Sequence, residues 1–154
     1  MGTLRRAACA LFVGMCPVST AAAHTGDGTG LSFGWPAQGS VTSPYGQDGG
    51  RWHPGIDIGV LRSLEVTAAA AGIVVAVGEP PHYSGYGEIV AVDVGSGLTT
   101  LYAHLAQPLV GMGQPVWAGE RIGIAGCTGW CTGTHLQFEL RENGAAVDPT
   151  ALLP

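Results

Sequence analysis

Short runs of β-branched residues alternate with glycine-containing turns along most of this sequence. The chain has 26 glycines and 10 prolines among its 154 residues, too many interruptions for long helices. From residue 31 onward, no segment keeps the apolar spacing of an amphipathic helix. The pattern therefore predicts an all-β domain with mainly antiparallel sheet. We expect strands at residues 66–77 (broken at Gly72), 89–94, 98–105, 116–117, 121–125 and 135–140.

Gly95-Ser96-Gly97 separates two of these segments and predicts a β-hairpin. Alternation along two others predicts one packed face and one polar face. The predicted core face carries Leu101, Ala103, Leu105, Leu136, Phe138 and Leu140. The predicted polar face carries Thr100, Tyr102, His104, His135, Gln137 and Glu139. Two histidines on that face make it a candidate floor for a catalytic groove.

The charged residues exclude several functions. The sequence contains no lysine, which argues against a P-loop, a Schiff-base enzyme and a biotin or lipoyl carrier. The sequence has six arginines against eleven acidic residues, and the arginines form no basic run. This balance argues against nucleic-acid binding.

The beginning of the sequence reads as a secretory signal. Arg5 and Arg6 precede an apolar stretch at residues 7–18, and small residues follow up to Ala23. The alternative, a membrane anchor, needs about 20 apolar residues. We therefore predict a signal peptide at residues 1–23, a flexible tail at 24–30, a domain at 31–154 and no membrane span in the mature protein.

Two of the four cysteines, Cys127 and Cys131, lie beyond the predicted signal. In an oxidising compartment such a close pair favours a disulfide, which would stiffen the turn before His135. The alternative is a metal-binding thiol pair.

Three elements carry residues suited to chemistry. They are His53-Pro54-Gly55-Ile56-Asp57, then His104 within residues 101–105, and then His135 within residues 133–139. Catalytic zinc takes three nitrogen or oxygen side chains and keeps one position open for water. His53 and Asp57 supply two ligands of this kind.

In this order, the motifs make residues 33–153 resemble the lysostaphin-type, LytM-like zinc endopeptidases of bacterial cell walls. The matching segments lie at residues 34–36, 42–46, 53–58, 69–74, 85–87, 102–105, 119–123, 126–129, 134–136 and 147–149. The resemblance implies a duplicated-hybrid-motif β-sheet core that forms a groove.

The resemblance also implies roles. His53 and Asp57 fall on two of the family's zinc ligands, and His104 and His135 fall on its two catalytic histidines. Zinc in such enzymes polarises the scissile carbonyl and activates a water, while a histidine handles the proton. The implied substrates are peptide bonds in peptidoglycan stems or cross-bridges, and we expect a secreted, wall-associated monomer.

One position departs from the family's pattern. The last strand normally carries His-x-His, whose second histidine is the third zinc ligand, and here that position is Gln137. Three interpretations follow: Gln137 binds zinc through its weaker carbonyl oxygen, His135 binds in its place, or no metal binds. In the third case the groove only binds peptidoglycan or activates another cell-wall hydrolase, as degenerate family members do.

Overall fold

The computed structural model describes residues 31–154 of the chain. The predicted signal peptide at residues 1–23 and the tail at 24–30 lie outside the described residues. Within residues 31–154 no helix has the length and apolar character needed to cross a bilayer.

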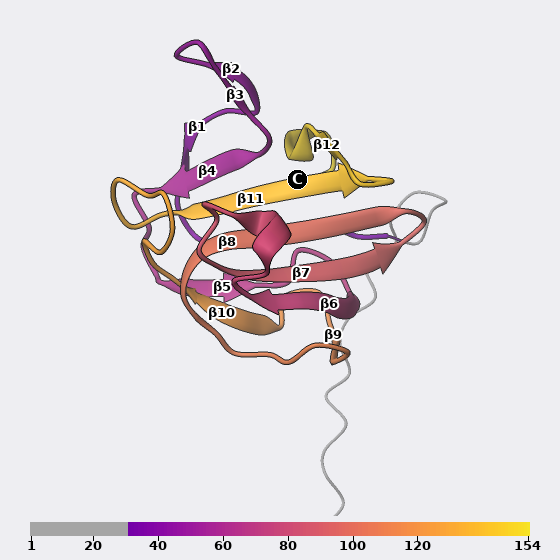
Figure 1. Cartoon of the computed structure of the whole chain (residues 1–154). Helices are drawn as coiled ribbons and strands as arrows, with labels where there is room; N and C mark the ends of the chain where they lie inside the picture. Colours follow the sequence, from indigo (N-terminus) through magenta and orange to yellow (C-terminus); the bar gives the residue numbers. More distant parts are fainter. Residues whose placement is uncertain (1–30) are drawn as a thin grey trace, which may run out of the picture.

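A twisted antiparallel sheet dominates the fold (Figure 1). Its neighbouring strands are, in order, β1 (Ser40–Ser43), β4 (Ile56–Gly59), β11 (Leu136–Glu142), β8 (Leu98–Pro108), β7 (Glu88–Gly95), β6 (Gly72–Gly78) and β9 (Pro115–Val116). The shorter strands β5 (Glu65–Thr67), β10 (Arg121–Ala125) and β12 (Ala145–Val147) attach to it, β10 pairing with both β5 and β8 and β12 with β11. The prediction of an all-β, mainly antiparallel fold is confirmed.

Three smaller elements complete the described part of the chain. Strands β2 (Gly46–Asp48) and β3 (Arg51–His53) form a separate hairpin, which stands beyond β1 and β4 in Figure 1. The two short 3₁₀ helices are η1 (Pro81–Tyr83) and η2 (Pro149–Ala151). The β2–β3 hairpin matters for function because it ends at His53.

The strands with strong local signals lie close to where the sequence predicts them. The segment 121–125 coincides with β10, and the segments 89–94 and 98–105 lie within β7 and β8. The predicted hairpin between β7 and β8 is present. Ser96 and Gly97 at its turn have φ of 56° and 78°, the positive values that a two-residue type I′ turn requires.

Other predicted boundaries are wrong. The segment 66–77 forms two strands, β5 and β6, because residues 68–71 leave the sheet while Ala68, Ala69 and Ala70 remain buried. Strand β11 begins at Leu136, and His135 makes only an isolated bridge with Gly126. Strands β1–β4 and β12 were not predicted, because they are short and lack clear alternation.

The predicted division of β8 into a core face and a polar face is wrong, because both faces of the sheet are covered. Tyr102 is fully buried in the larger core cluster and packs on Phe138 with ring centroids 5.3 Å apart. Leu101 and Ala103 pack in a second, smaller cluster on the other face. An alternating pattern therefore cannot identify a solvated face in this strand.

Candidate active site

The central position of β11 between β4 and β8 gathers the predicted site residues. Its Gln137 lies opposite Asp57 of β4 on one side and Ala103 of β8 on the other. The chain places the remaining three at the end of β3, next to Ala103 in β8, and just before β11. All five therefore line one hollow of about 350 Å³: His53, Asp57, His104, His135 and Gln137.

His53 and Asp57 meet across the Pro54-Gly55 turn that joins β3 to β4. Gly55 crosses β11 so closely that a Cβ there would collide with the Phe138 carbonyl oxygen. The buried His53 ring donates from Nδ1 to the Pro44 carbonyl at 2.9 Å. Its other nitrogen, Nε2, lies 3.2 Å from Oδ1 of Asp57.

His135 approaches the same carboxylate oxygen from a different part of the chain. Its Nδ1 donates to the Gly133 carbonyl at 2.7 Å, and its Nε2 lies 3.6 Å from Oδ1 of Asp57. A carbonyl oxygen only accepts hydrogen bonds, so each histidine carries a proton on Nδ1, and as a neutral ring it turns its Nε2 lone pair toward Asp57.

Oδ1 of Asp57 is buried and has no hydrogen-bond partner among the described residues. When both rings are neutral, two imidazole lone pairs and a carboxylate oxygen are all electron-rich, and a cation between them would make their approach favourable. Imidazole nitrogen and carboxylate oxygen are donors that zinc prefers, and these residues therefore fit a divalent metal. Within residues 31–154 no three His, Cys, Asp or Glu side chains already form a complete metal-binding group, so binding must draw these ligands together.

His104 reaches the site through an irregularity in β8. Its φ of 60° is left-handed, which is uncommon for a residue other than glycine. Strict alternation would place it on the face of Tyr102, yet its ring contacts Gln137 on the other face. The backbone N–H donates to the Tyr86 carbonyl at 2.9 Å and Nδ1 lies 2.8 Å from the Thr128 carbonyl, so the ring is held from two sides.

Gln137 is engaged at both ends of its amide. Its Nε2 donates to Oε1 of Glu139 at 2.9 Å, and its Oε1 lies 3.1 Å from Nε2 of His104. Glu139 is fully buried, and its second oxygen accepts from Nε and Nη2 of Arg141 at 2.9 and 2.7 Å. A continuous series of polar contacts therefore links His104 to Arg141 through Gln137 and Glu139.

Burial and the Glu139 carboxylate shift the pKa values of Tyr86 and Arg141. Burial, and then the Glu139 carboxylate, raise the pKa of Tyr86 well above its ordinary value. Burial lowers the pKa of Arg141, but the charge of Glu139 more than offsets this, so the net shift is upward. Arg141 therefore stays protonated beside a buried carboxylate.

A disulfide between Cys127 and Cys131, with Cα atoms 5.3 Å apart, closes the loop beside the site. The loop presents the Thr128 carbonyl to His104, and the Thr128 hydroxyl donates to the Leu105 carbonyl at 2.7 Å. This short loop thus fixes His104 against β8.

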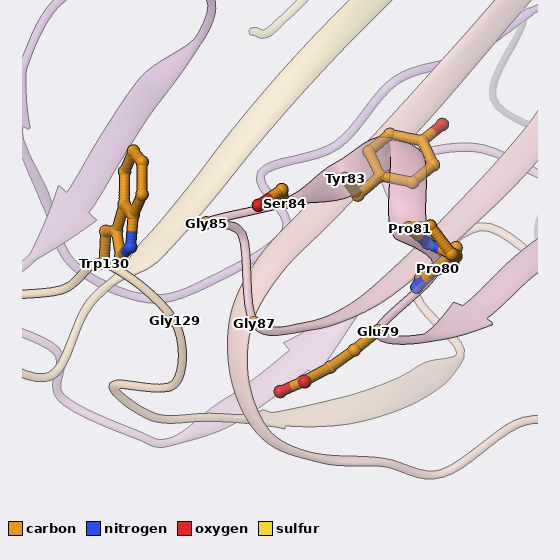
Figure 2. A pocket seen from close by; sticks show the side chains of 9 residues that line it. All are labelled: Glu79, Pro80, Pro81, Tyr83, Ser84, Gly85, Gly87, Gly129 and Trp130. Carbon is orange, nitrogen blue, oxygen red and sulfur yellow. The ribbon is translucent and has the colours of Figure 1, made fainter.

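Exposed tryptophans stand beside the hollow. Trp52 of β3 and Trp130 of the disulfide loop are 54% and 83% exposed, and both line a second hollow of about 240 Å³ that also includes His53 and Gln137. A third hollow of about 270 Å³ continues past Trp130 along residues 79–87 (Figure 2). The site therefore opens into a groove with aromatic walls.

A family model described as peptidase family M23 matches residues 51–149, the segment that holds all five site residues. The chain belongs to peptidase family M23. The resemblance to lysostaphin-type enzymes is thereby confirmed.

Several curated proteins are similar to this M23 chain. The lipoprotein YgeR of Escherichia coli is 39% identical over 78% of this chain and 46% of its own length. The DD-carboxypeptidase/endopeptidase Mpg of Neisseria meningitidis is 39% identical over 66% of this chain and 23% of its own length. The murein hydrolase activator NlpD of E. coli is 35% identical over 78% of this chain and 31% of its own length. The chain thus spans less than half the length of these relatives.

Solved structures show the same M23 fold. A zinc-containing peptidase from Vibrio cholerae is 30% identical with a TM-score of 0.67, over 76% of this chain and 39% of that one. The catalytic domain of lysostaphin from Staphylococcus simulans is 31% identical with a TM-score of 0.60, over 73% of this chain and 88% of that one.

Sequence reasoning missed Arg141 and gave Tyr86 no role beyond its matching motif. The sequence placed Glu139 on the predicted polar face, but its side chain is fully buried and therefore not solvated. A usable signal existed, since opposite charges two residues apart on one strand share a face.

Proposed function

We propose that this chain is a zinc endopeptidase of the bacterial cell wall that cleaves peptide bonds in peptidoglycan. One observation carries the proposal: Nε2 of His53 and Nε2 of His135 both approach a buried Asp57 oxygen that has no hydrogen-bond donor among the described residues. That arrangement lies in an open groove with space for an extended peptide.

The names of the relatives support this substrate class. Mpg is named as a carboxypeptidase and endopeptidase, and the similar Vibrio structure is that of a zinc-containing peptidase. NlpD is named for an action on murein hydrolases. Two of these names describe peptidases, and the third refers to murein.

His53 and Asp57 would hold zinc together with a third ligand, His135 or Gln137. When bound, zinc supplies a Lewis acid that polarises a peptide carbonyl and lowers the pKa of a water. In the resting arrangement Nε2 of His104 points into the site toward Gln137. From there His104 can exchange a proton with the reacting peptide, since its Nδ1 is held by the Thr128 carbonyl.

The residues that line the groove would bind the substrate. Trp52 and Trp130 offer flat apolar faces to substrate side chains, and Arg51 lines both central hollows with a permanent positive charge. A cation there favours a carboxylate on the bound peptide.

The test is digestion of purified peptidoglycan by the full chain, with released peptides identified by mass spectrometry. We expect new peptide ends, loss of cleavage with 1,10-phenanthroline and recovery on adding Zn²⁺. His53→Ala serves as the inactive control. The proposal fails if the zinc-loaded protein releases nothing, or if cleavage persists in His53→Ala.

A second candidate is a non-catalytic M23 module that binds peptidoglycan or activates another wall hydrolase. Its motivation is Gln137, which stands where the family has a zinc-binding histidine, together with the similarity to NlpD. This candidate predicts that the metal-free chain speeds a separate wall hydrolase. Robust cleavage by the chain alone contradicts it.

The proposed location is outside the cytoplasm, with residues 1–23 removed as a signal peptide. Wall substrates and a disulfide near the site both suit an oxidising, extracytoplasmic compartment. Mass spectrometry of the exported protein should find an amino terminus at His24, and a retained leader contradicts this cleavage.

A further inference from the structure

We propose that His135, rather than Gln137, is the third metal ligand, and that Gln137 positions His104. The inference rests on the proposed zinc function but concerns only which side chain completes the ligand set. Replacement of the family's ligand by glutamine would then relocate the third ligand by two residues along the chain without abolishing metal binding.

His53 and His135 share the arrangement that metal-binding histidines usually have. Each donates Nδ1–H to a backbone carbonyl, of Pro44 and of Gly133. Such a hydrogen bond fixes the tautomer and leaves Nε2 unprotonated for a metal. In both residues that nitrogen is the atom that faces Asp57.

The spacing of these atoms suits zinc. Ligand atoms about 2.0–2.1 Å from a tetrahedral zinc lie roughly 3.3 Å from one another. The two nitrogens lie 3.2 and 3.6 Å from Oδ1 of Asp57, on either side of that value. Two of the three ligand pairs are therefore close to their bound separation.

Gln137 is committed elsewhere. The carboxylate of Glu139 accepts hydrogen bonds and cannot donate, so the amide nitrogen of Gln137 must face it and the carbonyl must face His104. Turning that carbonyl toward a metal beside Asp57 would break both contacts. It would also deprive the fully buried Glu139 of a donor, which is costly in a dry environment.

Each histidine then has one task. His135 binds metal, and His104 is left as the histidine that handles the proton. The Gln137 carbonyl lies 3.1 Å from Nε2 of His104 and accepts a hydrogen bond from it when the ring carries a proton on both nitrogens, which keeps the ring directed into the site. Gln137 is accordingly a positioning residue.

The test measures metal affinity directly, by calorimetry of the full chain with Zn²⁺ and by the visible spectrum with Co²⁺. We expect His135→Ala to weaken Zn²⁺ binding by at least roughly 10–100-fold, the loss seen even for outer partners of metal ligands, and to change the Co²⁺ spectrum. Gln137→Ala should change the affinity less than about threefold and leave the spectrum unaltered. Thermal unfolding in EDTA checks that each variant folds.

Kinetics tests the positioning role. Gln137→Ala should lower kcat by at least roughly tenfold, the smaller end of what proton transfer contributes, while KM stays near its original value. A large loss of Zn²⁺ affinity in Gln137→Ala, or an unchanged affinity in His135→Ala, overturns the inference.

The two proposals fail in different ways. Wild-type protein that binds Zn²⁺ through His135 but cleaves no peptidoglycan contradicts the proposed function alone. Zinc-dependent cleavage that survives with full Zn²⁺ affinity in His135→Ala contradicts the ligand assignment alone. No Zn²⁺ binding by the wild type contradicts both.

Discussion

Glu139 organises the side chains of β11 although it does not itself line the hollows at the site. Its carboxylate is fully buried, with Gln137 on one oxygen and Arg141 on the other. A buried charge is tolerated only when paired and hydrogen-bonded, and here both conditions are met. The direction of the Gln137 amide, and through it the position of His104, depends on this one residue.

Neutralising that charge should therefore destabilise the fold. Glu139→Gln leaves the Arg141 guanidinium without its counter-charge, and we expect a loss of about 3 kcal/mol in the free energy of unfolding by urea. Glu142→Gln is the matched control, because this acid lies on the same strand but is exposed; its effect should stay within about 0.5 kcal/mol. Equal effects of the two substitutions would contradict the structural role of Glu139.

Gly55 is the second residue on which the site depends, because a side chain there has no room above β11. Its Cβ would collide with the Phe138 carbonyl and the side chain of Glu139. We expect Gly55→Ala to cost about 1–3 kcal/mol of unfolding free energy and to weaken Zn²⁺ binding by displacing Asp57. Gly111→Ala is the control, since no atom lies within 4 Å of its added Cβ. Equal stability of the two variants would show that the turn can shift without cost.

At the scale of elements, β8 shows where reasoning from sequence works and where it stops. The β7–β8 hairpin follows from a local signal, because Gly-Ser-Gly provides the positive φ values that its turn needs. The orientation of His104 does not follow, because a single left-handed φ moves its ring to the other face of the strand. Alternation assumes regular backbone, and this strand is irregular beside the site.

The site itself could be predicted in part. His53 and Asp57 lie four residues apart around a Pro-Gly turn, so their meeting is encoded locally. The hydrogen bonds of Gln137 depend on Glu139, on Arg141 and on a strand more than 30 residues away, and no motif records that combination. The sequence therefore names the residues at the site but does not say which side chain would be the third ligand of the proposed metal.

Strand β8 also joins the central sheet to residues 68–70 through one phenol. The Tyr102 hydroxyl accepts from the Ala69 N–H at 2.7 Å and donates to the Thr100 hydroxyl at 3.1 Å. Burial raises the pKa of Tyr102 from 10.0 to about 12. The folded state therefore binds this proton more tightly than the unfolded state does.

Stability should consequently fall in alkali. The contribution of Tyr102 to the free energy of unfolding is fully present below pH 10 and amounts to about 3 kcal/mol. It decreases as the pH rises from 10 toward 12. Urea unfolding between pH 9 and pH 11.5 measures this slope. Tyr102→Phe should reduce the slope without abolishing it, since the pKa of Tyr86 is also raised. An identical slope in that variant would mean that other groups cause the loss.

At the scale of the whole molecule, the proposed metal site would link segments that are distant in the sequence. His53 and Asp57 come from β3 and β4, whereas His135 follows the disulfide loop near the other end of the described chain. The two parts meet where β11, which directly follows His135, pairs with β4 and places Gln137 opposite Asp57. An ion bound by all three side chains, as proposed, would hold these segments together only in the folded state.

Zinc should therefore raise thermal stability by mass action. At a free Zn²⁺ concentration about 100 times Kd, the gain is about 2.7 kcal/mol, which for a chain of this size raises Tm by roughly 5–10 °C. Scanning calorimetry of the EDTA-treated protein with and without Zn²⁺ measures the shift. Mg²⁺ is the control ion, and it should have little effect because it prefers octahedral sites built from oxygen. His53→Ala should lose the zinc shift, and it should also unfold below the metal-free wild type because its buried ring donates to the Pro44 carbonyl. A zinc shift of unchanged size in His53→Ala would place the ion elsewhere on the molecule.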